Sequence, residues 1–139
     1  MARTKVRDAR HVRLYHWMLE SVAWATLTAN ARAIYIQIAA RYMGSNNGRI
    51  PYSVREAASA LRISTATASR AIRQLEELGF IATVIKGAFS FKKRHATEWR
   101  LTEFPGDVPG HSLGVATKDF MKMGVTPRRS PTAPPSLVN

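Results

Sequence analysis

Cysteine is absent from this chain of 139 residues, and acidic side chains are scarce. Without cysteine the chain has no disulfide framework, no cysteine-ligated zinc site or iron–sulfur cluster, and no thiol nucleophile. It also lacks a run of the about 18 apolar residues that a membrane-spanning helix needs, and its first residues lack the apolar block of a secretory signal. We therefore expect a soluble, cytoplasmic protein without a membrane partner.

The charge is strongly one-sided. Twenty-one Lys and Arg residues stand against nine Asp and Glu, which gives a formal net charge of +12 with histidine neutral. Such an excess favours a polyanionic partner, either nucleic acid or an anionic membrane surface. The basic residues are spread along the chain instead of lining one long amphipathic helix, as a membrane-surface helix would require. Nucleic acid is therefore the favoured partner, and we expect the protein to be associated with the nucleoid.

Proline divides the chain into three parts. Six of the seven prolines and four of the eight glycines lie at residue 105 or later, whereas all three tryptophans precede residue 100. We predict a basic N-terminal arm over residues 1–13, a packed domain over residues 14–104 and a flexible tail over residues 105–139. Within the tail, residues 116–123 form a short amphipathic segment that either folds onto a partner protein or a second subunit or stays unstructured.

Periodicity and capping residues predict three helices in the domain. Apolar residues recur at helical spacing over residues 29–42, after Thr28 as the N-cap. Ser53 and Glu56 form the pattern of a capping box and predict a helix over residues 54–61. Ser64 is a second good N-cap, for a helix over residues 65–78. A shorter amphipathic piece covers residues 16–25.

The predicted helix over residues 65–78 has two different faces. With Ala68 and Ile72 turned inward, the helical step turns Ala66, Arg70 and Arg73 to the opposite side. That outer face is small near its start and basic further along. This is the shape that can enter a DNA major groove and hydrogen-bond to base edges there.

A β-hairpin is predicted after this helix. Residues 80–85 are β-branched and aromatic, and residues 97–102 alternate polar and apolar side chains, which is typical of two strands. Residues 49–52 form a short extended piece that Pro51 confines to a sheet edge. The connection between the two hairpin strands, residues 86–96, is rich in basic side chains.

The order of these elements resembles a winged helix-turn-helix domain. The run from Ser53 to Ile81 is similar to bacterial winged-helix regulators of the MarR and GntR kind, and with residues 27–32 it is also similar to the DNA-binding domains of phage and plasmid replication initiators. The resemblance covers about residues 27–102. It implies an α+β, mainly α fold with a C-terminal β-hairpin wing. Relatives often have glycine where Arg62 stands, so a left-handed Arg62 would carry strain of about 1 kcal/mol.

The resemblance implies double-stranded DNA as the partner, with the recognition helix over residues 65–78 in the major groove and the wing on the backbone or in the minor groove. Ser64 and Thr65 would meet a phosphate, and Ala66 or Thr67 a thymine methyl group. Arg70 and Arg73 would contact either guanine or phosphate, and Gln74 adenine. The predicted DNA-binding residues are Ser64, Thr65, Ala66, Thr67, Ser69, Arg70, Arg73, Gln74, Lys86, Lys92, Lys93 and Arg94. The wing residues among them could equally be a solvated charge run, and the arm either follows the minor groove or is disordered.

We interpret the chain as a sequence-specific transcription regulator of bacterial, phage or plasmid type. The alternatives are a replication or recombination accessory factor at an origin or attachment site, and a winged-helix adaptor that binds protein. An enzyme is not expected, because the four histidines are scattered and no metal-binding or phosphate-loop spacing occurs. We expect no cofactor and no metal. A homodimer is plausible since one short recognition helix reads few base pairs, and the piece around Trp17 and Trp24 is either its interface or part of the core.

Overall fold

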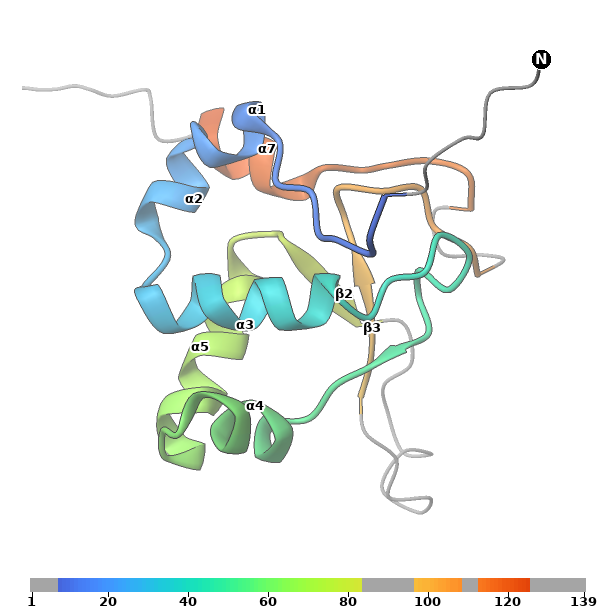
Figure 1. Ribbon diagram of the computed structural model, residues 1–139. Coiled ribbons are helices and arrows are strands. Elements are labelled where there is room, and N and C mark those ends of the chain that lie inside the picture. Colours follow the sequence, from blue (N-terminus) through green and yellow to red (C-terminus); the bar gives the residue numbers. More distant parts are fainter. Residues whose placement is uncertain (1–7, 84–96, 109–112, 126–139) are drawn as a thin grey trace, which may run out of the picture.

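Figure 1 shows the computed structural model, which describes residues 8–83, 97–108 and 113–125. Helix α3 runs through the middle of the molecule, with α4 and the start of α5 on one side and α1, α2 and α7 on the other. A small sheet stands at the end of α3. The helices are α1 (His16–Leu19), α2 (Val22–Thr26), α3 (Ala29–Ala39), α4 (Val54–Leu61), α5 (Thr65–Glu77) and α7 (Asp119–Val125). The mainly helical α+β fold predicted for a winged helix-turn-helix domain is confirmed.

The predicted amphipathic piece over residues 16–25 is divided into α1 and α2. Ser21 divides it, because its hydroxyl donates to the Met18 carbonyl (2.7 Å) and accepts from the Trp24 amide (3.1 Å). The same side chain thus ends one helix and caps the next. Met18, Ala23 and Trp24 point into the core, so core packing is the role that the structure gives Trp24.

Helix α3 starts where predicted, with the Thr28 hydroxyl accepting from the Ala31 amide at 3.1 Å. It ends at Ala39, three residues before the predicted end at residue 42. The side chain of Asn46 accounts for the early end. Its amide donates to the Arg41 carbonyl (3.0 Å) and accepts from the Met43 amide (2.8 Å). These bonds satisfy backbone groups that would otherwise continue the helix.

The sheet has the order β1–β3–β2, with both pairs antiparallel. Its strands are β1 (Ile50–Pro51), β2 (Ile81–Thr83) and β3 (Glu98–Leu101). The predicted hairpin strands and the short edge piece with Pro51 are therefore confirmed, in shorter form. The fully buried Asn47 lies in the turn before β1 and supports β3 from there. Its side chain accepts from the Leu101 amide (2.7 Å) and donates to the Leu101 carbonyl (2.9 Å).

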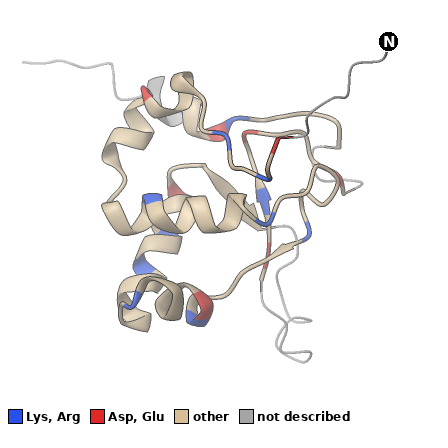
Figure 2. Cartoon of the chain, viewed as in Figure 1, with Lys and Arg blue, Asp and Glu red and all other residues tan. Residues whose placement is uncertain are grey.

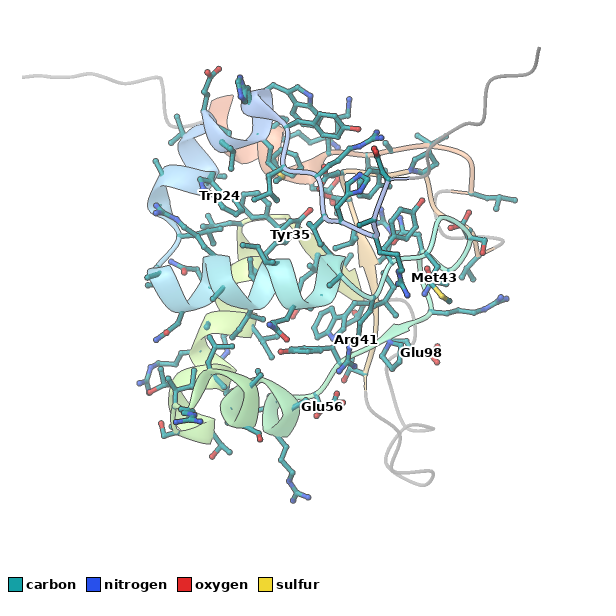
Figure 3. The ribbon with its side chains drawn as sticks, viewed as in Figure 1. Trp24, Tyr35, Arg41, Met43, Glu56 and Glu98 are labelled. Carbon is teal, nitrogen blue, oxygen red and sulfur yellow. The ribbon has the colours of Figure 1, made fainter. Side chains whose placement is uncertain are left out.

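An aromatic cluster fills the core between the helices and the sheet. Figure 3 labels two of its members, Trp24 and Tyr35. Phe80, which follows α5, meets both rings edge-on at 5.7 Å between centroids, and it stacks on Phe120 at 4.7 Å. Edge-on and offset contacts are the arrangements that aromatic rings prefer. Phe80 is thus held by aromatic contacts on three sides.

Glu103 is a buried acid beside this cluster. It is 4% exposed, and its Oε1 accepts a hydrogen bond from the Tyr35 hydroxyl. Its Oε2 is buried with no hydrogen-bond partner among the described residues. Burial raises the pKa of Glu103, and the Tyr35 hydrogen bond and nearby Lys118 oppose that rise. Burial, with Glu103 close by, also holds the pKa of Tyr35 well above its ordinary value.

Part of the predicted flexible tail belongs to the packed domain. Helix α7 (Asp119–Val125) packs against α2, and Phe120 is fully buried. At Gly79 (φ +87°), a Cβ atom would come within 2.8 Å of the backbone of Asp119 and Phe120. The boundary placed at residue 104 is therefore wrong. It was drawn from the content of proline and glycine, which does not show that Phe120 is buried in the core. The amphipathic segment at residues 116–123, for which folding and no structure were both left open, overlaps α7 at residues 119–125.

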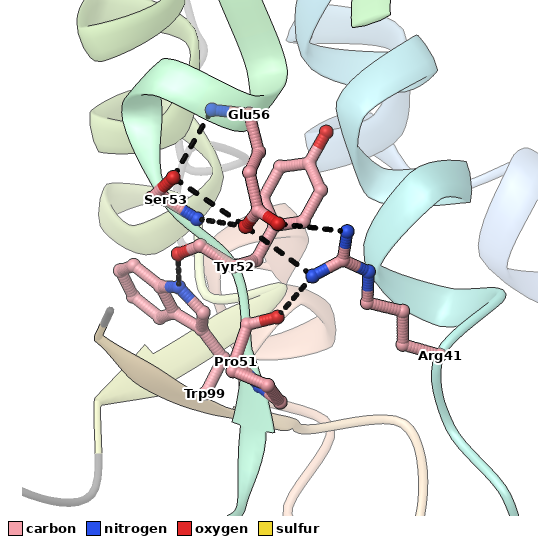
Figure 4. Close-up of polar contacts among 6 residues, drawn as sticks. All are labelled: Arg41, Pro51, Tyr52, Ser53, Glu56 and Trp99. Carbon is pink, nitrogen blue, oxygen red and sulfur yellow. Dashed lines mark hydrogen bonds and ion pairs between the residues drawn. The ribbon is translucent and has the colours of Figure 1, made fainter. Parts of the chain in front are cut away.

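Arg41 links the end of α3 to the start of α4 (Figure 4). Its guanidinium donates to the Pro51 carbonyl (2.6 Å) and to both oxygens of Glu56 (3.3 and 3.2 Å). Glu56 completes the predicted capping box, since it accepts from the Ser53 amide at 3.0 Å. The Arg41 hydrogen bond is the main cause that lowers the pKa of Glu56. Both side chains are partly exposed, so this pair orients α4 more than it stabilises the fold.

Candidate DNA interface

The turn between α4 and α5 is built on a left-handed residue. Arg62 has φ 59° and ψ 48° and ends α4. The Ile63 amide then donates to the Ala58 carbonyl at 3.0 Å, and Ser64 caps α5 directly afterwards. Arg62 thus adopts the left-handed conformation for which the sequence predicts strain. This conformation lets α5 begin after only three intervening residues, Arg62, Ile63 and Ser64.

Helix α5 has the two faces that the sequence predicted. Ala68, Ala71, Ile72 and Leu75 are buried, and α5 packs against both α3 and α4. On the opposite side Ala66, Arg70 and Arg73 are exposed, and Ser69 is half-buried; Thr65 is exposed at the start of the helix. Figure 2 shows the basic residues along α5 and on the neighbouring α4. The outer face of α5 is therefore open to a partner.

Three side chains of the predicted interface are joined along the first turns of α5. The Ser64 hydroxyl accepts from the Thr67 amide (3.0 Å) and donates to the Thr67 hydroxyl (3.0 Å). The same Thr67 oxygen accepts from Nη2 of Arg70 at 3.3 Å. This arrangement turns the Arg70 guanidinium toward the N-terminal end of α5.

The side-chain amide of Gln74, which was predicted to contact adenine, is bound to backbone groups of its own chain. Its Oε1 accepts from the Thr28 amide at 3.0 Å, and its Nε2 donates to the Thr26 carbonyl at 3.3 Å. Both ends of the amide are thus bound to the corner between α2 and α3. Sequence periodicity placed Gln74 at the edge of the outer face but gave no sign that this corner lies within reach.

A groove runs beside the outer face of α5. It is bordered by Thr28 and Asn30 at the start of α3, and by Thr67, Arg70, Arg73 and Glu77 of α5, with Gln74 between them. The groove thus brings the two predicted DNA-reading arginines to one opening. Glu77 was not predicted as part of the site, although it shares the outer face by helical spacing.

The two remaining parts of the predicted interface are the wing and the N-terminal arm. The wing residues Lys86, Lys92, Lys93 and Arg94 lie outside the described residues. Residues 8–12 of the arm border a hollow with Ala40, Tyr42 and Met43, at the end of α3. This is the side of α3 away from α4 and the start of α5 (Figure 1). The described part of the arm therefore lies away from the outer face of α5.

Comparison with known protein families supports this reading. Residues 25–81 match the family model of a helix-turn-helix domain. This segment is a helix-turn-helix domain. It spans α3, β1, α4 and α5, and ends on the first residue of β2. No curated protein and no solved structure matches the chain.

The helix-turn-helix domain at residues 25–81 supports DNA binding. The resemblance to MarR- and GntR-type regulators or to replication initiators remains an expectation, because the match reports the domain and not the subfamily. Within the described ranges, no three His, Cys, Asp or Glu side chains come together as a metal site. Among the same residues, no helix has both the length and the hydropathy to cross a bilayer.

Proposed function

We propose that this chain is a sequence-specific, double-stranded-DNA-binding transcription regulator that inserts α5 into the major groove. The observation that carries the proposal is the outer face of α5, where Ala66, Arg70 and Arg73 are exposed while the opposite face is locked into the core. The major groove admits one α-helix, and close approach requires small residues where the helix meets the bases. Ala66 satisfies that requirement next to two long donors.

The arginines supply base discrimination in this proposal. An arginine pairs in bidentate fashion with O6 and N7 of guanine, which contributes about 1 to 3 kcal/mol of discrimination. Ser64 and Thr65, at the start of α5, meet a phosphate, where the helix dipole favours negative charge. Gln74 is withdrawn from base contact, since both ends of its amide hold the α2–α3 corner.

The test is selection of bound sequences from random duplexes at near-physiological salt, using the full chain and the variants Arg70→Ala and Arg73→Ala. Each variant is expected to lose preference at particular base positions. Arg10→Ala is the matched control, because it removes the same charge from an exposed residue beyond the end of α3. The proposal fails if the unaltered protein selects no sequence, or if the α5 variants retain its full preference.

Regulation of transcription is the finer part of the proposal. A small basic domain that reads one DNA site is suited to cover a promoter, and the alternative is a replication or recombination factor with the same interface. Mapping the bound sites in cells distinguishes the two. Sites that overlap promoters support regulation, whereas repeated sites confined to an origin or attachment site contradict it.

We also propose that the chain acts without catalysis. The support is chemical: its four histidines are scattered in sequence, and its few carboxylates offer no pair suited to two-metal chemistry. Incubation with duplex DNA and Mg²⁺ should leave the DNA intact. Cleavage by the purified chain that a matched inactive preparation does not show would overturn this point.

A further inference from the structure

Arg70 is tethered to a neighbouring side chain on α5. Its Nη2 donates to the Thr67 hydroxyl oxygen, which also accepts from the Ser64 hydroxyl. These three residues stand three positions apart, so their side chains lie on one face of the helix. A long arginine side chain would otherwise sample many rotamers and lose that freedom on binding.

The tether leaves most of the guanidinium available. An arginine carries five N–H donors, and the bond to Thr67 uses one of them. The remaining donors still form the fork that a guanine edge accepts. With two hydrogen bonds accepted, the Thr67 oxygen has only its own proton left to offer, which suits a contact to an acceptor but not to a base amino group.

We propose that Thr67 is a positioning residue for DNA reading: its hydroxyl, held by the Ser64 cap, orients Arg70 before DNA arrives. The inference rests on the proposed function, because it assigns base discrimination to Arg70. It replaces the thymine-methyl contact expected for Thr67 with an indirect role. Discrimination at the base read by Arg70 then depends on an oxygen that need not touch that base.

Thr67→Val tests the role, because valine keeps the β-branched shape and the capped backbone amide but removes the hydroxyl. The preferred duplex and a random duplex of equal length are compared as ligands. We expect the ratio of specific to nonspecific affinity to fall about two- to tenfold, the effect of one hydrogen bond. Thr67→Ser, which keeps the hydroxyl, should retain the ratio. The salt slope should not change, because no charge is removed.

A double-mutant cycle with Arg70→Ala separates positioning from direct contact. If Thr67 acts through Arg70, Thr67→Val has no further effect once Arg70 is alanine. An equal loss in both backgrounds would show that Thr67 contacts DNA itself and would overturn the proposal. Thermal unfolding of Thr67→Val should match the parent protein, so that a folding defect is recognised.

A measurement on the free protein keeps this inference distinct from the proposed function. NMR relaxation of the Arg70 Nε–H group should report a more mobile side chain in Thr67→Val than in the parent or in Thr67→Ser. Equal mobility in all three overturns the positioning role, whatever the DNA results. Ordered Arg70 in a protein that selects no sequence would instead refute the proposed function and leave the tether standing.

Discussion

Arg62→Gly is expected to stabilise the domain, although it removes a side chain. Arg62 holds φ 59° and ψ 48°, a left-handed conformation in which an L-residue carries strain of about 1 to 2 kcal/mol. Glycine adopts it without that strain but loses more freedom on folding, which costs about 0.5 to 1 kcal/mol. Because the Arg62 side chain is exposed, no core contact is lost. With the middle of each range, the net gain is about 0.75 kcal/mol.

For a domain of this size, that gain raises the midpoint of thermal unfolding by about 3 to 6 °C. Arg62→Ala is the matched control, since it removes the same charge and keeps the Cβ atom that causes the strain. Urea unfolding of the parent and both variants should give equal slopes and a higher midpoint for glycine alone. If the glycine variant is no more stable than the alanine variant, the strain at this turn has been misjudged.

Three further perturbations follow from the packing. Gln74→Ala should lower the free energy of unfolding by about 1 to 2 kcal/mol, because it removes two hydrogen bonds to the α2–α3 corner. Lost base preference with unchanged thermal stability would instead support the prediction that Gln74 contacts adenine. Phe120→Ala should cost about 3 to 5 kcal/mol in chemical unfolding, since the ring is fully buried against Phe80, and an unaffected midpoint would refute the packing of α7. Glu103, whose raised pKa means that the folded state binds the proton more tightly, should make stability fall as pH rises from the ordinary carboxyl pKa through the folded one. Glu103→Gln should lack this fall in thermal unfolding at pH 4 to 8 and be more stable than the parent at neutral pH; parallel pH profiles would contradict this.

Local signals predicted the helix-turn-helix segment well. Ser53, Ser64 and Thr28 each act as the cap that the sequence indicated. Arg62 takes the left-handed conformation that was considered for it because relatives often have glycine at that position. Each of these features depends on interactions within a few residues, which a sequence displays directly. The buried and exposed faces of α5 follow for the same reason, because helical spacing alone determines them.

Features that depend on distant residues were missed. The two hydrogen-bond partners of Gln74 were missed, because Thr26 and Thr28 lie 48 and 46 positions away in the sequence. The tail boundary failed in the same way, since nothing near Phe120 in the sequence shows that its ring completes a cluster around Phe80. Glu103 was not singled out, because a buried acid cannot be told from a surface one without its surroundings.

The close contact between Gly79 and the start of α7 has a consequence for how the protein is made. The helix-turn-helix segment is complete by residue 81, but the ring that closes its aromatic cluster is Phe120. During synthesis, α5 therefore leaves the ribosome well before α7, which carries Phe120, has left the exit tunnel. Until then, Phe80 and Trp24 expose hydrophobic surface, which favours aggregation or binding by chaperones. Shortening the gene from its 3′ end should thus harm yield before it harms recognition.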